Sequence, residues 1–475
     1  MVLYVVGFIA AAEGGLLLLP AFVGLIYHET DAFAYLAVSG GCALSGLLAI
    51  RFFRTANHTI YAREGFSIVA LGWIFTSAAG ALPFVISGGI PNYIDALFET
   101  VSGFTTTGAS ILPDVGILSH ASLFWRSFTH FIGGMGVLIF IMAVIPNIAD
   151  RSINIMRAEM PGPVVGKLVP RVRQTALILY LIYVGMTLAE IILLLCGGMP
   201  LFDSICYSFG TAGTGGFSAT REGIVTPWSQ WVVAVFMMLF GVNFNLYYLI
   251  IAKKWRAALS SFELWVYLGM ITVATVIITV CIFPEYGNAG DSIRHAFFQT
   301  VSIQTTTGYA TADFDKWNTL ARTLLLLLMF VGGCAGSTAG GLKVSRVIIC
   351  FKTVGREIRR LLHPRAYGTV RFERRQLDEQ TVNGVSSYIL VYLICFGATF
   401  LLLSFDKYGF VENFSAAAAC LNNIGPGFGA VGPASNYSGY SAFSKIVLSL
   451  SMLAGRLELY PLLLTFLPSL RSRKF

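Results

Sequence analysis

Short runs of threonine and glycine recur along this chain. Residues 96–108 read A-L-F-E-T-V-S-G-F-T-T-T-G, and residues 296–308 read A-F-F-Q-T-V-S-I-Q-T-T-T-G, so nine of thirteen positions are identical. Weaker copies occupy residues 203–217 and 412–427. When the copies are aligned on the glycine after each polar run, their anchors are Gly108, Gly215, Gly308 and Gly425. Such a repeat indicates an architecture of four equivalent units.

These residue types suit the binding of a dehydrated monovalent cation. Backbone carbonyls and threonine hydroxyls can replace its hydration shell, and glycine permits the backbone angles that turn carbonyls toward a common axis. The apolar segment before each polar run is too short to cross a bilayer, which takes about 20 helical residues. We therefore expect four short re-entrant helices whose C-terminal dipole ends favour a cation beneath them. The alternative interpretation is that T-T-T-G is only a turn that ends a helix, which a single copy would favour.

The composition is that of a membrane protein. Of the 475 residues, 56% are hydrophobic and 12% are charged, whereas a soluble domain carries about 25% charged residues. The net charge of +8 could suggest nucleic acid as a partner. Because the basic residues fall in alternate loops, we expect no nucleic-acid binding. No set of nucleophile, base or metal ligands converges in the sequence, so we expect no enzyme.

Hydropathy predicts an all-α polytopic protein with ten spans. They are expected at residues 2–26, 33–53, 66–88, 123–145, 175–197, 228–251, 264–283, 319–350, 385–404 and 442–467. With the N-terminus in the cytoplasm, 24 of the 32 Lys and Arg residues lie in inside loops, as the positive-inside rule requires. Both termini are then cytoplasmic, and the re-entrant segments enter from an outer face whose acidic residues would concentrate cations.

The motifs carry a family resemblance. They are T-T-T-G-A-S at 105–110, T-A-G-T-G-G-F-S at 211–218, T-T-T-G-Y-A-T at 305–311 and N-N-I-G-P-G at 422–427. Through these motifs, and along its whole length, the chain resembles the Trk/Ktr/HKT superfamily of potassium transporters. It most resembles the bacterial TrkH/TrkG type. The resemblance implies two N-terminal helices (1–64) followed by four M1–P–M2 pore-loop repeats around one pseudo-fourfold ion pore. The repeats are assigned to residues 65–160, 161–258, 259–378 and 379–475.

The resemblance also implies which residues bind the ion. Potassium is the expected transported ion, and no organic cofactor is expected. One key glycine per filter strand implies modest selectivity over rubidium and sodium. The residues expected to form the filter are Thr106, Thr107, Gly108, Gly213, Thr214, Gly215, Thr306, Thr307, Gly308, Asn423, Ile424 and Gly425.

A glycine-rich run divides the expected span at 319–350. Residues 332–341 read G-G-C-A-G-S-T-A-G-G, and the 32-residue stretch around them would form a helix about 48 Å long, too long for the bilayer core. We expect an intramembrane loop. The alternative is a close-packing helical face, because Gly332, Gly336 and Gly340 are spaced at i, i+4 and i+8. The family's gating loop corresponds to this stretch and implies a gate role for Gly333, Gly336, Ser337, Thr338 and Gly340.

Arg456 falls inside the last expected span. An arginine there costs about 2.5–3.5 kcal/mol on insertion scales, so it should face a cavity or a partner. A structural ion pair with another span is one interpretation, and Glu458 would point elsewhere on a continuous helix. The other is a positive charge under the filter that repels resting cations, a gating role that an arginine has in the family.

The expected partners follow from the basic stretch 343–375 and from the resemblance. The stretch is either ordinary positive-inside charge or a docking face. The resemblance implies a homodimer with a cytosolic nucleotide-binding, TrkA-like regulatory subunit, in the lipid of the bacterial inner membrane. Channel-like flux and symport with protons or sodium both stay open, as do proton sites at Glu13 and Glu190. The alternatives are a sodium-stimulated KtrB-type transporter and an organic-solute carrier, which would show inverted repeats.

Overall fold

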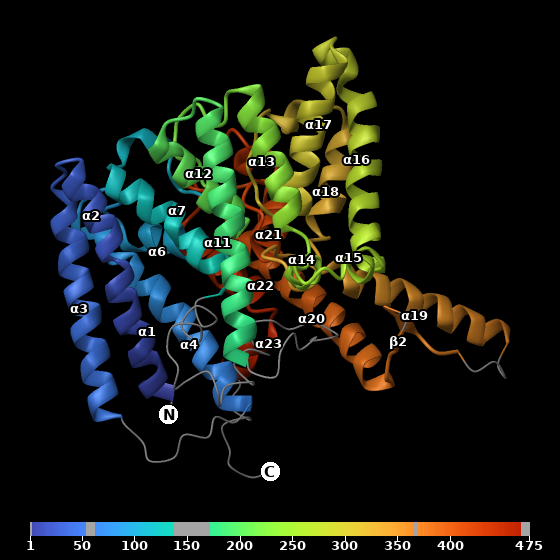
Figure 1. Ribbon diagram of the computed structural model, residues 1–475, viewed down its shortest axis with the longest axis horizontal. Coiled ribbons are helices and arrows are strands. Elements are labelled where there is room, and N and C mark those ends of the chain that lie inside the picture. Colours follow the sequence, from blue (N-terminus) through green and yellow to red (C-terminus); the bar gives the residue numbers. More distant parts are fainter. Residues whose placement is uncertain (1, 54–61, 137–171, 364–367, 374, 467–475) are drawn as a thin grey trace.

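The computed structural model describes residues 2–53, 62–136, 172–363, 368–373 and 375–466. This part of the chain is almost entirely helical (Figure 1). Its one sheet is a small antiparallel hairpin of β1 (Arg371–Phe372) and β2 (Arg375–Gln376), in which Arg371 pairs with Gln376. The expectation of an all-α architecture is confirmed apart from this hairpin.

The N-terminal unit is a closely packed helical pair. Helices α1 (Val2–Leu16) and α2 (Leu18–Ile26) form one span, and α3 (Asp31–Phe52) returns beside it. Glycines let the backbones meet, because a Cβ added to Gly46 would lie 2.6 Å from the backbone nitrogen of Ala11, and one added to Gly14 would lie 2.8 Å from that of Ala43. Small residues at such contacts are typical of helices packed in membranes.

Four repeats follow, each with an outer helix, a short pore helix and an inner helix. The outer helices are α4 (Ala62–Gly80) with its continuation α5 (Leu82–Ile86), α11 (Val172–Cys196), α16 (Phe262–Tyr286) and α20 (Glu379–Leu403). The pore helices are α6 (Tyr93–Phe104), α12 (Leu201–Gly213), α17 (Ala289–Gln304) and α21 (Phe410–Asn422). With 12 to 16 residues each, they are too short to span a bilayer.

The inner helices are the least regular parts of the repeats. They are α7 (His120–Gly134), α13 (Pro227–Phe240) with α14 (Phe244–Ile251), α18 (Thr319–Met329) with α19 (Val344–Leu362), and α22 (Ala442–Arg456) with α23 (Tyr460–Phe466). Helix α15 (Trp255–Leu259) links repeats two and three. The single-turn 3-10 helices η1 (Val115–Ile117), η2 (Phe314–Lys316) and η3 (Gly429–Val431) follow the pore segments of repeats one, three and four.

Within the described residues, six helical stretches are long and apolar enough to cross a membrane, and two sharply bent pairs bring the number to eight. The chain is therefore a multi-pass membrane protein. The expected span at 123–145 runs beyond Gly136 into residues outside the described part. The eighth expected span, at 319–350, is interrupted between α18 and α19.

Two spans expected to be continuous are broken, so that prediction was wrong. The chain bends by 92° between α13 and α14, and by 119° between α22 and α23. At the first break, the Asn243 side chain caps α14 by accepting a hydrogen bond from the backbone of Asn245. At the second, Glu458 and Leu459 have φ values of 51° and 68°, a left-handed conformation that no α-helix can contain.

The break at the glycine-rich run is present as predicted. Residues 330–343 form a non-helical loop between α18 and α19, and a β-bridge between Val331 and Leu342 closes it. The alternative of a continuous helix with a glycine face was therefore wrong. Gly336 has a φ of 76° and Gly341 a φ of 64°, which glycine adopts without steric strain.

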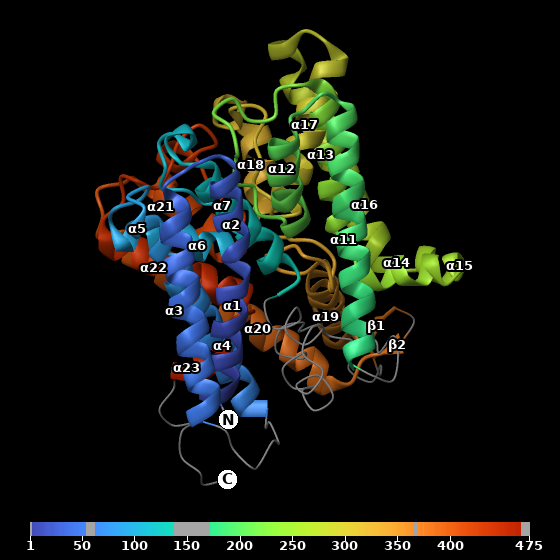
Figure 2. The ribbon, with the colours of Figure 1, turned by 60° about the vertical axis from the view of Figure 1, so that its left-hand side comes forward.

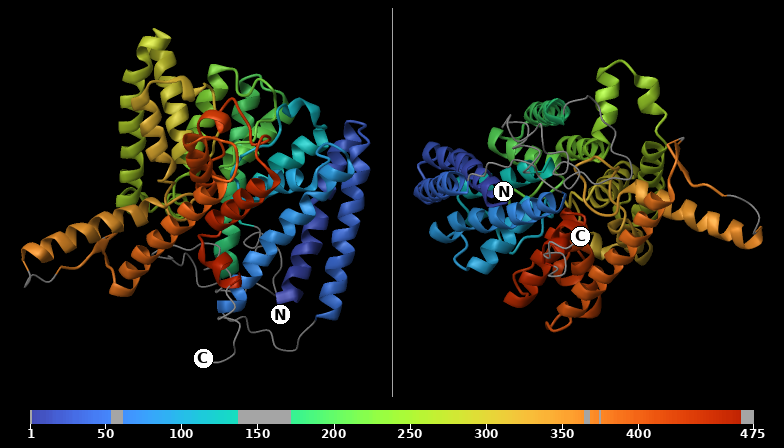
Figure 3. Two further views of the ribbon diagram at one scale, coloured as in Figure 1. Left: turned by 180° about the vertical axis from the view of Figure 1, so that it is seen from behind. Right: turned by 90° about the horizontal axis from the view of Figure 1, so that it is seen from below.

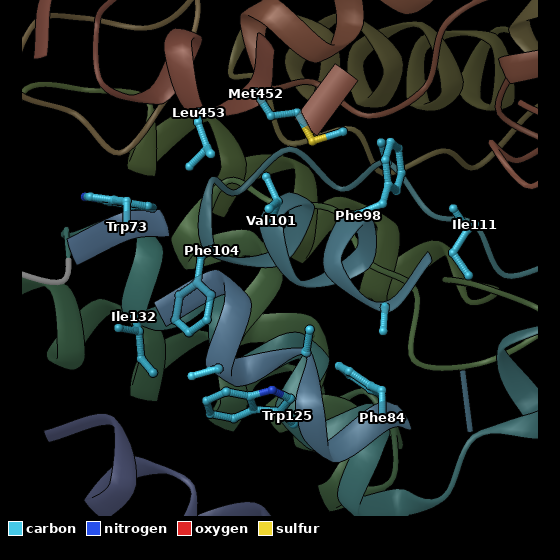
Figure 4. Packing of buried hydrophobic residues seen from close by; sticks show 14 of the residues in the cluster. Trp73, Phe84, Phe98, Val101, Phe104, Ile111, Trp125, Ile132, Met452 and Leu453 are labelled. Carbon is cyan, nitrogen blue, oxygen red and sulfur yellow. The ribbon is translucent and has the colours of Figure 1, made fainter. Parts of the chain in front are cut away.

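The repeats succeed one another around the molecule. Seen from below, the colours run from the blue N-terminal helices through green and yellow to the red C-terminal helices (Figure 3). The turns between α2 and α3 and between α16 and α17 lie on one side, and the start of α1 and helix α19 lie toward the other (Figures 1 and 2). Figure 4 shows α6 inside an apolar core, with Trp73 of α4, Trp125 of α7 and Met452 of α22 around it.

Candidate ion pore

All four pore helices end in the same backbone conformation. One or two positions after each helix ends, one residue has a left-handed conformation, with φ values of 56–59° at Thr106, Thr214, Thr306 and Asn423. Two residues later comes a glycine with positive φ, of 77°, 77°, 83° and 96° at Gly108, Gly216, Gly308 and Gly425. The residue between them donates its N–H to a carbonyl inside the helix, as from Thr107 to Ser102 at 2.8 Å and from Ile424 to Ala419 at 2.9 Å.

This geometry corrects the sequence alignment of repeat two. The glycine that corresponds to Gly108 is Gly216, not Gly215, because Gly216 has the positive φ. Gly215 corresponds to Thr107, since its N–H donates to Gly210 at 2.8 Å in the same pattern. Gly213, expected in the filter, is the last residue of α12. The strand of repeat two therefore consists of Thr214, Gly215 and Gly216.

The four strands form a closed ring. A Cβ added to Gly108 would lie 1.8 Å from the carbonyl oxygen of Gly215 in repeat two. A Cβ added to Gly216 would lie 2.0 Å from the oxygen of Thr307, and one added to Gly308 would lie 1.9 Å from that of Ile424. The ring closes at Gly425, where an added Cβ would lie 2.8 Å from the oxygen of Thr107 in repeat one. Four equivalent carbonyls thus lie at one level, each beside the glycine of the preceding repeat.

Several threonine hydroxyls are hydrogen-bonded within the protein. The Thr105 hydroxyl donates to Val101 at 2.7 Å and lies 2.8 Å from the Thr107 hydroxyl, which also accepts a 2.9 Å bond from Asn423 Nδ2. Thr305 and Thr307 are 2.8 Å apart in the same way. These hydrogen bonds fasten strand one to its pore helix and to strand four.

Beyond the glycines lies an open vestibule of about 640 Å³, with Gly108, Gly216, Gly308 and Gly425 at its floor. Five acidic residues on this side are paired with bases. The pairs are Asp95–Lys445 at 2.6 Å, Asp114–Arg221 at 2.5 Å, Asp291–Arg294 at 2.6 Å, Asp313–Lys316 at 3.1 Å and Asp315–Arg322 at 2.8 Å. The negative field expected from the acidic residues is therefore weaker than the sequence suggests.

The intramembrane loop lies directly beneath the strands. The N–H of Gly340 donates to the Thr306 hydroxyl at 2.6 Å, and a Cβ on Gly340 would lie 2.6 Å from the oxygen of Asn422. The loop thus touches the inner ends of the strands of repeats three and four. Its residues Gly336, Ser337 and Gly340 line a cavity of about 70 Å³, together with Lys343 and with Arg456 of α22.

Arg456 is placed at the break after α22, not inside a continuous span. Its Nη1 donates to the oxygen of Thr338 in the loop at 2.8 Å. Its Nη2 donates to Gly133 at 2.5 Å and to Gly134 at 2.7 Å, at the end of α7. The guanidinium thus joins repeats four, three and one under the filter. Glu458, which is not helical, pairs with Arg346 at the start of α19.

Two further anchors hold the loop, and neither was predicted from the sequence. The Glu263 carboxylate accepts from Ala335 at 2.8 Å and from Ser345 at 2.9 Å, so one side chain holds both arms of the loop. Gly241, at the α13–α14 break, accepts from Cys334 at 2.9 Å. An acidic residue in the first turn of an otherwise apolar span was the available sign for Glu263. Glu13 and Glu190 are buried, in α1 and α11.

Comparisons with known proteins agree with this architecture. The sequence model of the TrkH family, a cation transport protein, matches residues 40–475. The Trk system potassium uptake protein TrkH of Salmonella typhimurium is 36% identical over 98% of both chains. The protein TrkG of Escherichia coli K12 is 35% identical, covering 98% of this chain and 97% of its own.

A solved structure gives the same result in three dimensions. The crystal structure of the potassium transporter TrkH from Vibrio parahaemolyticus matches with a TM-score of 0.89 and 32% sequence identity, covering 99% of both chains. The expected fold of N-terminal helices and four M1–P–M2 repeats is confirmed, and the relatives are transporters and not enzymes. The chain therefore belongs to the TrkH family of cation transport proteins.

Proposed function

We propose that this chain is the potassium-conducting pore of a bacterial potassium uptake system. The observation that carries the proposal is the closed ring of strands, in which four carbonyls lie at one level, each beside a glycine of the preceding repeat. Carbonyls so placed can replace the hydration shell of potassium. The relatives are named as potassium uptake proteins, which supports potassium as the ion carried.

The ion-binding backbone is assigned to the strands as the structure aligns them. They consist of Thr106, Thr107 and Gly108; Thr214, Gly215 and Gly216; Thr306, Thr307 and Gly308; and Asn423, Ile424 and Gly425. The inner ends of the pore helices supply partial negative charge beneath these strands. Because each strand has one left-handed glycine at its outer end, we expect modest discrimination between potassium and sodium.

The gate is assigned to the loop and to Arg456. Gly333, Gly336, Ser337, Thr338 and Gly340 belong to a loop that lies across the inner end of the filter, and its hydrogen bond to Thr306 supports a closed arrangement. Arg456 adds a positive charge at the same level and holds Thr338. Opening then requires the loop to move away from Thr306 and Arg456.

The proposal includes a regulatory partner and an orientation in the membrane. A cytosolic, nucleotide-binding, TrkA-like subunit would act from the side where the basic helix α19 extends from the body (Figures 1 and 3). We place this side and both termini in the cytoplasm of a homodimer in the bacterial inner membrane. The N-terminal unit of α1 to α3 favours the TrkH type over the KtrB type. The ring of like-oriented pore helices argues against an organic-solute carrier, which would need inverted repeats.

Rubidium-86 uptake into proteoliposomes tests the proposal. The purified chain is reconstituted with and without its co-purified regulatory partner, and unlabelled potassium, sodium or choline competes with the label. We expect uptake that potassium suppresses at lower concentration than sodium, while choline has no effect. Absence of monovalent cation flux in both preparations would overturn the proposed pore.

A further inference from the structure

A buried ion pair lies behind the outer end of the filter in repeat one. Glu99 of pore helix α6 and Arg126 of α7 are 1% and 2% exposed, and Arg126 Nε donates to Glu99 Oε1 at 2.5 Å. Removing one partner from a buried pair leaves an uncompensated charge and is strongly destabilising. A pair at this position therefore requires further hydrogen bonds to hold both charges.

The carboxylate of Glu99 holds strand one. Its Oε1 accepts from the Ser110 hydroxyl at 2.9 Å, and its Oε2 accepts from the N–H of Ile111 at 2.9 Å. Ser110 and Ile111 follow Gly108 by two and three residues. The pore helix is thus fastened to the chain just beyond the glycine whose position defines the ring.

The guanidinium of Arg126 reaches from strand one to strand two. Its Nη2 donates to the Ser110 hydroxyl at 3.1 Å, and its Nη1 donates to the oxygen of Ser218, two residues after Gly216, at 2.9 Å. It also lies 3.8 Å above the ring of Phe217, whose other neighbour is His130 at 4.2 Å between ring centres. The planar, forked geometry of arginine allows these contacts together, which a lysine cannot make.

The other repeats fasten their strands at the same position with neutral groups. The residue nine before the filter glycine is Tyr207 in repeat two, where its hydroxyl lies 2.8 Å from that of Thr220. In repeat three it is Gln299, whose amide lies against the backbone at Ala312. In repeat four the neighbouring Ser415 accepts from Phe428 at 2.9 Å. Of these four contacts between pore helix and strand in the described residues, only the one in repeat one uses charged side chains.

We propose that Glu99 and Arg126 are positioning residues for ion selectivity, a role that rests on the proposed potassium pore. The pair joins the two strands two residues beyond the contact between Gly108 and the carbonyl of Gly215. It fixes the separation of strands one and two at the value that suits potassium. Loosening the pair lets these carbonyls approach a smaller ion, so sodium gains relative to potassium.

The test compares initial rates of rubidium-86 and sodium-22 uptake by the full-length protein in proteoliposomes. The variants are Glu99→Gln, Arg126→Gln and the double variant. A single variant leaves an unpaired charge near the pore mouth, which alters the flux of all monovalent cations alike. The ratio of the two rates removes that effect. The double variant has no unpaired charge, so it remains informative where a single variant folds poorly.

A matched control is available in the same region. Arg221 and Asp114 also join repeats one and two, but their side chains are 66% and 36% exposed. An exposed pair is screened by water and contributes little. We expect Arg221→Gln to keep the rubidium-to-sodium ratio of the wild type.

We expect the double variant, purified in normal amount, to show a ratio lowered by about tenfold, which corresponds to about 1.4 kcal/mol of lost discrimination. An unchanged ratio in the double variant, or an equal fall in Arg221→Gln, would overturn the proposal. A wild type without cation flux would instead refute the proposed pore, so the two failures are distinguishable.

Discussion

The guanidinium of Arg456 donates a 2.8 Å hydrogen bond to the carbonyl oxygen of Thr338, which ties the end of α22 to the intramembrane loop. The other arm of the guanidinium holds Gly133 and Gly134 at the end of α7. One planar cation with five donors can bridge three chain segments in this way. The loop cannot leave the inner end of the filter while these bonds persist.

Replacing Arg456 by alanine should raise cation flux. The variant loses the charge under the filter and hydrogen bonds of about 1.5–3 kcal/mol each, so the closed state is destabilised by tenfold or more. Rubidium-86 uptake at equal protein amount measures the change. Arg256→Ala, on the peripheral helix α15, is the control and should behave as wild type. An Arg456→Ala rate at or below that of the wild type would contradict the gate assignment.

Replacing Glu263 by alanine should also raise flux, without changing the rubidium-to-sodium ratio. The N–H groups of Ala335 and Ser345 lose their shared acceptor, so both arms of the loop are released. The matched control is Glu285→Ala, an exposed acidic residue at the opposite end of α16. The uptake rates of rubidium-86 and sodium-22 measure both the flux and its ratio. Unchanged flux, or a changed ratio, would show that Glu263 does not act through the loop.

The N-terminal unit offers a stability test independent of transport. Gly46→Val places a side chain where the backbone of α1 lies 2.6 Å from the added Cβ, and overpacking of this kind costs about 1–3 kcal/mol. We expect a lower Tm in detergent than for the wild type. Gly41→Val, on the same helix, adds its Cβ where no atom lies within 4 Å. Equal melting temperatures for the two variants would refute the close packing of α1 on α3.

Local sequence features predicted much of the fold. The short re-entrant helix expected before the T-T-T-G of repeat one is α6 (Tyr93–Phe104), and its apolar run ends in small polar residues and glycine. The interruption of the span at 319–350 was also predictable, since a glycine-rich run cannot sustain a helix of that length. Both features depend on residues close together in the sequence.

Features that depend on distant partners could not be predicted. The bend after α13 is held by the bond from Cys334 to Gly241, and the bend after α22 by the pairing of Glu458 with Arg346. These partners lie about 90 to 110 residues away in the chain, as the pairing shows. On the outer face, the pairs Asp95–Lys445 and Asp114–Arg221 likewise join residues more than 100 positions apart in the chain.

The register of repeat two also depends on the backbone conformation. Its sequence T-G-G offers two adjacent glycines, Gly215 and Gly216, that fit the anchor position equally well. Only the backbone angles distinguish them, because Gly216 alone of the two has a positive φ. Where a repeat is degenerate, residue type does not determine register.

We propose that the ring of carbonyls beside the four glycines selects the ion. The most direct measurement is the ratio of rubidium-86 to sodium-22 uptake in Gly308→Ser, with Gly269→Ser on α16 as control. The added side chain at Gly308 starts 1.9 Å from the oxygen of Ile424, whereas Gly269 has no atom within 4 Å of its added Cβ. We predict a ratio lowered by about tenfold or more in Gly308→Ser and a wild-type ratio in Gly269→Ser. A conducting Gly308→Ser protein with the wild-type ratio would contradict the account.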